Sequence, residues 1–309
     1  MTTILYTHES CAGHDPGPMH PESPSRLHAV TKALGTDEFA ELTQQEAPLA
    51  EIEQITRIHP RALVDQIFDT VPTEGRVMIE GDTSISSQSG EAALRGVGAL
   101  CAAVDAVSSR KADNAFCAIR PPGHHAEPNR PMGFCLFNNV AAGAEHARKI
   151  HGAERVAVVD FDVHHGNGTQ AMFWEDPGLF FASTHQMPLY PGSGAESERG
   201  AHGNIVNIPL SPFSNGNAFR AGMGEQILPA LRKFAPEFLF ISAGFDAHTD
   251  DPLAQLNLVE DDYAWATAEL LDVAADVCDG RVVSTLEGGY NLNALANCVA
   301  THVQVMMEI

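Results

Sequence analysis

The sequence predicts an α/β fold, a single three-layer α/β/α domain with a mostly parallel central sheet. Short apolar runs alternate with longer stretches of helical periodicity along the whole chain. The clearest runs, such as residues 156–159, are apolar at both parities, which is typical of strands covered on both faces. No linker interrupts the pattern, so we expect one domain over residues 1–309.

The elements follow in a regular order. Strands are expected at 3–6, 115–119, 156–160, 179–183, 205–208, 238–242 and 282–286. Helices are expected at 25–35, 60–70, 91–109, 138–151, 217–234, 260–278 and 291–307. Loops rich in Gly, Pro and His cover 8–24, 120–137, 161–169 and 184–203. The last three follow strands directly, so they lie at the carboxyl edge of the sheet, where open α/β sheets bind ligands.

Composition narrows the classes of partner and compartment. The chain has 40 Asp and Glu against 18 Lys and Arg, a formal charge of −22, which argues against nucleic acid and favours cationic amines. Solubility alone would explain the charge equally well. Six cysteines without a C-x-x-C pair indicate neither a disulfide framework nor a structural zinc module. With no signal peptide and no apolar run long enough to span a membrane, we expect a cytoplasmic protein without a membrane partner.

The ends of two apolar strands carry residues typical of a metal site. Asp160, Asp162 and His164 share one parity, so their side chains point the same way in extended backbone. Asp246 follows another apolar strand and completes a set of carboxylate and imidazole ligands. An isolated D-x-H would more often be capping aspartates and a core histidine, but two matching strand ends favour a metal. Arginase-like enzymes place a further carboxylate where this chain has Gly166, so we expect one ion rather than two.

Two further motifs suggest hydrolysis. His124 and His125 follow a strand within the rigid sequence R-P-P-G-H-H-A, and imidazoles can serve as base and acid near neutral pH. Tyr290 follows a strand and two glycines that allow close backbone approach, so its phenol could stabilise an oxyanion. By themselves, a His-His pair is usually a surface feature and Gly-Gly-Tyr a turn.

Together these motifs resemble the histone deacetylase family in order and spacing. The matching segments are R-P-P-G-H-H-A, G-F-C-L-F-N-N, D-F-D-V-H-H-G-N-G-T, S-A-G-F-D-A-H-x-x-D-P-L and E-G-G-Y, at residues 120–126, 133–139, 160–169, 242–253 and 287–290. The likeness begins at the H-P-E of residues 20–22 and covers nearly the whole chain. The residues of the last three motifs are similar to those of the class II branch and its bacterial relatives.

The resemblance implies two cation sites. A catalytic Zn²⁺, with Fe²⁺ as the alternative ion, would be bound by Asp162, His164 and Asp246. A structural K⁺ would be bound at Asp160 and at main-chain oxygens around Asp162, His164, Ser183 and Thr184.

The resemblance also implies catalytic roles. His125 would be the base and acid, His124 its electrostatic partner, and Tyr290 the group that polarises the acetyl carbonyl. Asp160 would stand behind His124, and Asn167 behind His125. Class I members usually place aspartate at the latter position. A neutral amide stabilises an imidazolium less than a carboxylate does. We therefore expect the pKa of His125 to be lower than that of the corresponding histidine in class I members.

The implied substrate site is a tunnel. Gly133 would accept the substrate N–H at its carbonyl, Phe134 and Tyr190 would form aromatic walls, and Leu253 would lie at the mouth, where polyamine-selective relatives carry an acidic residue. The expected activity is zinc-dependent removal of acetyl or related acyl groups from lysine side chains of peptides, proteins or similar small amines, releasing acetate. The alternatives are an acetylpolyamine amidohydrolase, a longer-chain deacylase and, from another class, a non-catalytic acetyl-lysine reader. A homo-oligomer formed through the first loop is compatible with the sequence.

Overall fold

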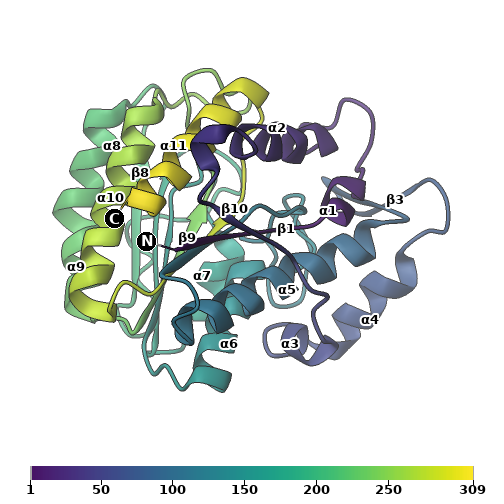
Figure 1. Cartoon of the computed structure of the whole chain (residues 1–309), viewed down its shortest axis with the longest axis horizontal. Helices are drawn as coiled ribbons and strands as arrows, with labels where there is room; N and C mark the ends of the chain where they lie inside the picture. The colour runs from purple at the N-terminus through teal and green to yellow at the C-terminus, as the bar shows by residue number, and fades with distance from the viewer. Residues whose placement is uncertain (1, 309) are drawn as a thin grey trace.

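An eight-stranded parallel sheet forms the centre of the computed structural model, which describes residues 2–308 (Figure 1). Its strand order is β2-β1-β5-β10-β9-β6-β7-β8. The strands are β1 (Thr3–Thr7), β2 (Thr43–Glu46), β5 (Asn114–Cys117), β6 (Val156–Asp160), β7 (Leu179–Gln186), β8 (Ile205–Leu210), β9 (Phe238–Ala243) and β10 (Val282–Leu286). A separate antiparallel hairpin joins β3 (Arg76–Glu80) to β4 (Thr83–Ser86).

Helices cover both faces of this sheet (Figure 1). One layer contains α5 and α6, with the shorter α3, α4 and α7 around them; the other contains α2, α8, α9, α10 and α11. The helices are α1 (Glu9–Gly13), α2 (Pro24–Leu34), α3 (Ile52–Thr56), α4 (Arg61–Thr70), α5 (Ser89–Ser108), α6 (Asn139–His151), α7 (Asn167–Phe173), α8 (Gly216–Gly222), α9 (Leu228–Phe234), α10 (Glu260–Cys278) and α11 (Leu292–Glu308). The predicted three-layer α/β arrangement is therefore confirmed. Met1 and Ile309 lie outside the described residues, so the predicted domain limits of 1–309 stay a prediction at both ends.

Burial on both faces explains the continuous apolar strands. Every residue of β6 and β9 is buried, and these two neighbours pair in register from Val156 opposite Phe238 to Asp160 opposite Ser242. Burying a side chain such as Val or Phe stabilises the fold by about 1.5–3 kcal/mol. All seven predicted strands are present, and their bounds shift by at most a few residues.

Some local predictions were wrong. Strand β2 was missed because its four residues, T-Q-Q-E, are polar and exposed at the sheet edge, so no apolar pattern marks them. The expected loop 8–24 contains α1, the loop 161–169 runs into α7, and the first residues of 184–203 extend β7. The helix expected at 217–234 is confirmed as one continuous helical stretch over 216–234, in which a π-helical segment at Met223–Ile227 joins α8 to α9. The short α3 and the β3–β4 hairpin were also missed.

The strand order brings the important loops together. Strands β5, β10, β9, β6 and β7 are consecutive neighbours and all parallel, so the segments after them meet at one carboxyl edge.

In residues 2–308, none of the helices combines the length and apolar character needed to cross a bilayer.

Candidate active site

Three predicted metal ligands converge at the carboxyl edge. Asp162 and His164 follow β6, and Asp246 follows the adjacent β9. The Nδ1 atom of His164 lies 3.2 Å from Oδ1 of Asp162 and 3.0 Å from Oδ2 of Asp246. One donor atom from each residue lies within 4.8 Å of the others, and all three side chains are buried. This is the nitrogen and oxygen donor set that suits a divalent ion.

Main-chain N–H groups fix the two carboxylates. Val163 donates to Oδ1 of Asp246 over 2.9 Å, and Gly288 donates to Oδ2 of Asp162 over 2.7 Å. A side chain at Gly288 would collide with both carboxylates, so only glycine fits where the β10 loop passes the site. The ligands are thus oriented by the backbone of two different loops.

The electrostatics of the cluster favour a cation. Burial, and then the Asp162 charge, raise the pKa of Asp246. Burial would also raise the pKa of Asp162, but His124 and His164 hold it far below its usual range. Burial would lower the pKa of His164, yet hydrogen bonds to Asp162 and Asp246 raise it to about 10. Two adjacent buried carboxylates need a compensating positive charge, and a divalent ion fits this donor set.

The adjacent histidines have opposite environments. The rings of His124 and His125 lie 4.0 Å apart. Nδ1 of His124 lies 2.9 Å from Oδ2 of Asp160; burial would lower the pKa of His124, but the Asp160 charge raises it to about 10. Burial, and then the His124 charge, hold the pKa of His125 well below its usual range. Titrating groups whose pKa values are driven apart in this way suit distinct acid–base roles.

Asn167 determines which nitrogen of His125 can accept a proton. Nδ2 of Asn167 donates to Oε1 of Glu127 over 2.8 Å, so its Oδ1 faces Nδ1 of His125 at 2.8 Å. Because that oxygen only accepts, Nδ1 of His125 carries the proton and Nε2 keeps the lone pair. His125 is therefore arranged as a neutral base.

Tyr290 is held by contacts to its backbone and its ring. Oδ2 of Asp251 accepts the N–H of Tyr290 over 2.7 Å, and the guanidinium of Arg26 lies 5.0 Å from the ring centre. Burial, and then the Asp246 charge, raise the pKa of Tyr290 well above its usual range. The phenol consequently remains a hydrogen-bond donor.

A cavity of about 200 Å³ leads to these groups. Predicted residues on its wall are His125, Gly133, Phe134, His164, Tyr190, Leu253 and Tyr290; Asp82 and Leu189 complete it. The ring of Tyr190 lies 5.1 Å from that of His125, and the ring of Phe134 lies 6.1 Å from that of Tyr290. All the predicted substrate-contacting residues therefore surround one cavity.

Gly133 approaches the histidine loop closely. Its φ is +57°, and a Cβ there would collide with the ring of His125, so both backbone conformation and space require glycine. The N–H of Gly133 donates to Oδ1 of Asp82 over 3.0 Å. This contact ties the cavity wall to the β3–β4 hairpin.

The residues of the expected K⁺ site also lie together. Asp160 pairs with Ser183 in the β6–β7 register, and Thr184 follows Ser183 directly. Oδ1 of Asp160 accepts the N–H of Asp162 over 3.0 Å, and the Ser183 hydroxyl contacts Nδ1 of His185 at 2.9 Å. All these residues are buried. Their role in binding K⁺ stays a prediction.

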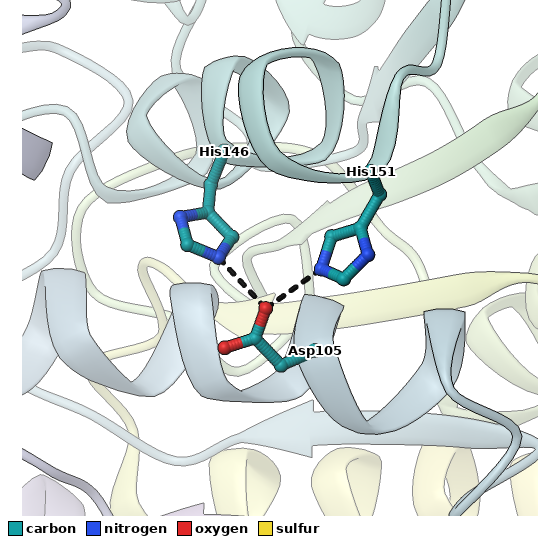
Figure 2. Close-up of side chains that lie close together, drawn as sticks. All are labelled: Asp105, His146 and His151. Atoms are coloured by element: carbon teal, nitrogen blue, oxygen red, sulfur yellow. Dashed lines mark hydrogen bonds and ion pairs between the residues drawn. The ribbon is translucent and has the colours of Figure 1, made fainter.

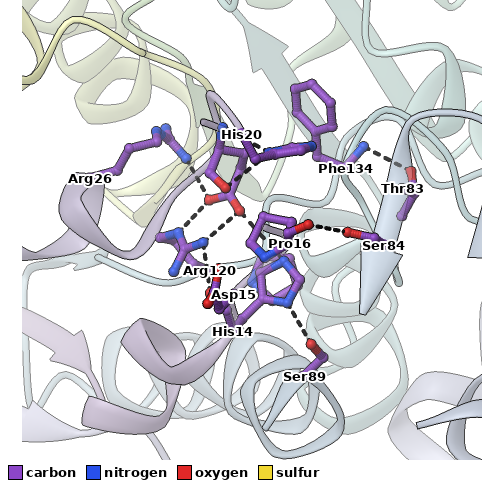
Figure 3. A network of polar contacts seen from close by, with 12 residues as sticks. His14, Asp15, Pro16, His20, Arg26, Thr83, Ser84, Ser89, Arg120 and Phe134 are labelled. Atoms are coloured by element: carbon purple, nitrogen blue, oxygen red, sulfur yellow. Dashed lines mark hydrogen bonds and ion pairs between the residues drawn. The ribbon is translucent and has the colours of Figure 1, made fainter. Parts of the chain in front are cut away.

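A buried charge network supports the site from the first loop (Figure 3). The Glu22 carboxylate pairs with both Arg26 and Arg120, and all three side chains are inaccessible to solvent. Burial would raise the pKa of Glu22, but Arg120 and further positive neighbours lower it to about 2. Nε of Arg26 donates to the carbonyl of Gly289 over 2.6 Å. The network therefore joins the first loop to the loops that carry His124 and Tyr290.

Sequence reasoning missed three residues of the site. Glu287 accepts hydrogen bonds from the N–H groups of Gly123 at 2.7 Å and His124 at 3.2 Å, so it holds the histidine loop. Its position directly before Gly-Gly-Tyr was a usable signal. Asp82 and Leu189 reach the cavity from a hairpin turn and a loop, and no local pattern marks either.

The chain is similar to known proteins over most of its length. A family model described as "Histone deacetylase domain" matches residues 20–306. "Histone deacetylase 14, chloroplastic" of Arabidopsis thaliana is 38% identical over 98% of this chain and 76% of its own length. "Histone deacetylase-like amidohydrolase" of Pseudomonas aeruginosa is 39% identical over 91% of this chain and 74% of its own.

A solved structure shows the same fold. The crystal structure of the HDA15 HD domain superposes with a TM-score of 0.92 at 32% identity, covering 98% of this chain and 88% of that one. Sequence and fold therefore agree along almost the whole chain, which belongs to the histone deacetylase family of hydrolytic enzymes that act on acetylated substrates.

Proposed function

We propose that this chain is a zinc-dependent deacetylase that hydrolyses the acetyl–amine bond of acetyl-lysine side chains in peptides or proteins. The observation that carries the proposal is the cavity of about 200 Å³, whose wall includes His125, His164 and Tyr290. A narrow cavity with aromatic walls suits a linear aliphatic amine whose acyl group reaches these three side chains.

Asp162, His164 and Asp246 would hold the ion, with Fe²⁺ as the alternative to Zn²⁺. Bound there, the ion would supply Lewis acidity that acidifies water and polarises the acetyl carbonyl. The support is the converging donor set with its two buried carboxylates. Asp160, Ser183 and Thr184, with main-chain oxygens around Asp162 and His164, would hold the structural K⁺.

The remaining residues divide the acid–base work. His125, neutral with its lone pair on Nε2, would take a proton from the attacking water as the new C–O bond forms. Tyr290 would donate a hydrogen bond to the oxyanion, a contact worth about 2.7–4 kcal/mol in comparable sites. His125 would then give its proton to the leaving nitrogen as the C–N bond breaks. His124, held protonated by Asp160, would stabilise negative charge throughout.

Lysine-type substrates are favoured over acetylpolyamines by Leu253. It lines the cavity together with Leu189, so both of these wall positions carry aliphatic side chains. The one carboxylate on the wall, Asp82, already accepts hydrogen bonds from the Gly133 N–H and the Thr83 hydroxyl. A cytoplasmic location stays a prediction; the six cysteines, unpaired in the described residues, are typical of a reducing compartment.

A substrate panel tests the proposal. It comprises acetyl-lysine, trifluoroacetyl-lysine and longer acyl-lysine peptides together with acetylpolyamines, assayed with metal-stripped protein reloaded with Zn²⁺ or Fe²⁺. The expected result is metal-dependent release of acetate from acetyl-lysine peptides in preference to acetylpolyamines. A preference for acetylpolyamines or longer acyl chains would replace the substrate assignment, and no turnover with bound metal would contradict the mechanism.

A further inference from the structure

A second cluster of metal-ligand side chains lies at the opposite edge of the sheet. Asp105 is in the last turn of α5, and His146 and His151 are in the second half of α6. Both helices run back toward the starts of the strands that follow them, β5 and β6. The cluster is therefore at the amino edge, away from the catalytic groups, and metal binding there would be independent of the proposed function.

The geometry of the cluster matches three donors around one point. Figure 2 shows His146 and His151, both on α6, on either side of the Asp105 carboxylate of the facing helix α5. Nε2 of His146 lies 2.8 Å from Oδ1 of Asp105, and Nε2 of His151 lies 2.7 Å from the same oxygen. All three donor atoms lie within 4.8 Å of one another. Ligands bound tetrahedrally at ~2.0 Å from zinc are ~3.3 Å apart, so each imidazole nitrogen would have to move away from Oδ1 of Asp105 by about half an ångström to admit an ion.

The two helices that present these donors are closely packed. A Cβ at Gly143 of α6 would lie only 3.2 Å from Cβ of Leu100 of α5, so the helix axes approach closely there. The spacing between Asp105 and the two histidines is therefore set by the fold rather than by long flexible side chains.

The cluster has a buried side and an open side. The His146 side chain is 6% exposed and that of Asp105 is 54% exposed. His151 also borders a cavity of about 340 Å³ at the amino edge, lined further by Glu237, Phe238 and Arg281. A metal held here would have protein ligands on one side and an open position for water on the other.

Protonation is compatible with metal binding. Burial lowers the pKa of His146, which keeps its ring neutral near pH 7. Partial burial acts to raise the pKa of Asp105, but hydrogen bonds from His151 and His146 lower it, so it is a carboxylate. The chain's formal charge of −22 also favours cations.

One contact opposes metal binding. Nη1 of Arg57 lies 3.1 Å from Nδ1 of His146, so in the metal-free protein Nδ1 accepts and Nε2 carries the proton. A metal on Nε2 requires that proton to be lost and Nδ1 to become protonated. Arg57 must then turn away, toward Glu53, whose Oε1 is already 3.5 Å from its Nη2. Arg57 therefore weakens the site without closing it.

We infer that Asp105, His146 and His151 form a second metal site, which binds one divalent transition-metal ion of the zinc class and joins α5 to α6. Two imidazoles and one carboxylate favour Zn²⁺ and similar ions over Mg²⁺ or Ca²⁺, which prefer oxygen-only sets.

Metal stoichiometry tests this inference on the full chain. Protein is dialysed to equilibrium against buffered Zn²⁺, and bound metal is measured by elemental analysis. We expect wild-type protein to bind one equivalent more than His151→Gln or Asp105→Asn, both of which change exposed side chains. His28→Gln, an exposed histidine of α2, is the matched control and should keep the wild-type value.

A variant of the catalytic cluster separates the two sites. Asp246→Ala should lose the catalytic equivalent and keep the amino-edge one, and Asp246→Ala combined with His151→Gln should lose both. The same titrations with Co²⁺ give a visible spectrum for each site independently of activity. The inference is overturned if Asp246→Ala binds no metal, or if the wild-type stoichiometry persists in both His151→Gln and Asp105→Asn.

Arg57→Gln should increase metal affinity at the amino edge, whereas the other substitutions there should lower it. Removing the guanidinium frees Nδ1 of His146 to carry the proton, so affinity at the amino edge should increase severalfold in the Asp246→Ala background. An unchanged or weaker affinity would contradict the arrangement described here.

Discussion

The two edges of the sheet present similar ligands in different settings. At the carboxyl edge, Asp162, His164 and Asp246 are buried, and backbone N–H groups orient both carboxylates. At the amino edge, Asp105 and His151 are exposed and are held by side-chain contacts alone.

Because of this difference, we expect catalysis at the carboxyl edge and metal binding without catalysis at the amino edge. A buried, preorganised site strengthens electrostatic interactions and needs little rearrangement during reaction, whereas a cluster that is open on one side is partly screened by water. Changes at the carboxyl edge should therefore have large effects, and changes at the amino edge small ones.

The largest effect is expected for Asp246→Ala. Loss of a catalytic ligand should remove bound metal and lower kcat/KM by at least about 10³-fold, since the ion supplies several kcal/mol of transition-state stabilisation. Steady-state deacetylation and metal content are the measurements. Activity that survives without the catalytic metal would show that the reaction does not need an ion at the carboxyl edge, and the two edges would then not differ as described.

Glu22→Gln should destabilise the fold most. It leaves Arg26 and Arg120 buried without a counter-charge, which should cost about 3–5 kcal/mol of unfolding free energy in denaturant titrations. The folded-state pKa of Glu22, about 2, lies below the ordinary value of 4.5, so this stabilisation is present above pH 4.5 and is lost as the pH falls toward 2. Wild-type and variant curves should converge over that range; a constant difference would assign the loss to packing.

Tyr290→Phe should act on the reaction rather than on the fold. Removing the phenol hydroxyl should reduce kcat by about 10²–10³-fold with little change in KM, because the hydrogen bond forms mainly to the oxyanion. Tyr190→Phe is the matched control at the cavity wall and should leave kcat within a few-fold of wild type. An equal loss in both variants would remove Tyr290 from oxyanion stabilisation.

Asn167→Asp should shift the pH profile. A carboxylate 2.8 Å from Nδ1 of His125 favours the imidazolium, so the pKa of His125 should rise by roughly 1 unit or more. Because the base must be neutral, the acidic limb of kcat/KM against pH should move to higher pH. A shift to lower pH, or none, would show that another group controls that limb.

The smallest effect is expected for His151→Gln without added metal. Exposed pairs of this kind contribute about 0–1 kcal/mol, so thermal unfolding and kcat should stay close to wild type. A large loss of activity would show that the amino edge communicates with the catalytic edge and would break the comparison.

The sequence predicted most of the elements that burial determines. Strands β6 and β9 could be found because apolar residues occupy both faces, and their ends identified Asp162, His164 and Asp246 as neighbours. Strand β2 could not, because an exposed polar edge strand carries no hydrophobic pattern.

The support around the site was less predictable. The pairing of Glu22 with Arg120 joins residues 98 positions apart, and Asp82 reaches the cavity from a hairpin turn. Such contacts depend on tertiary packing, and no short sequence window contains them. The convergence of Asp105 with His146 and His151 depends in the same way on how α5 packs against α6.

The most direct measurement of the central claim is a metal titration of stripped protein. Zn²⁺ would be added stepwise while acetate release from an acetyl-lysine peptide and bound metal are followed together, in wild type and in His151→Gln. The account predicts no turnover without metal and, in His151→Gln, activity that rises in proportion to a single equivalent. Turnover by the metal-free protein, or activity that appears only with metal bound at Asp105, would contradict it.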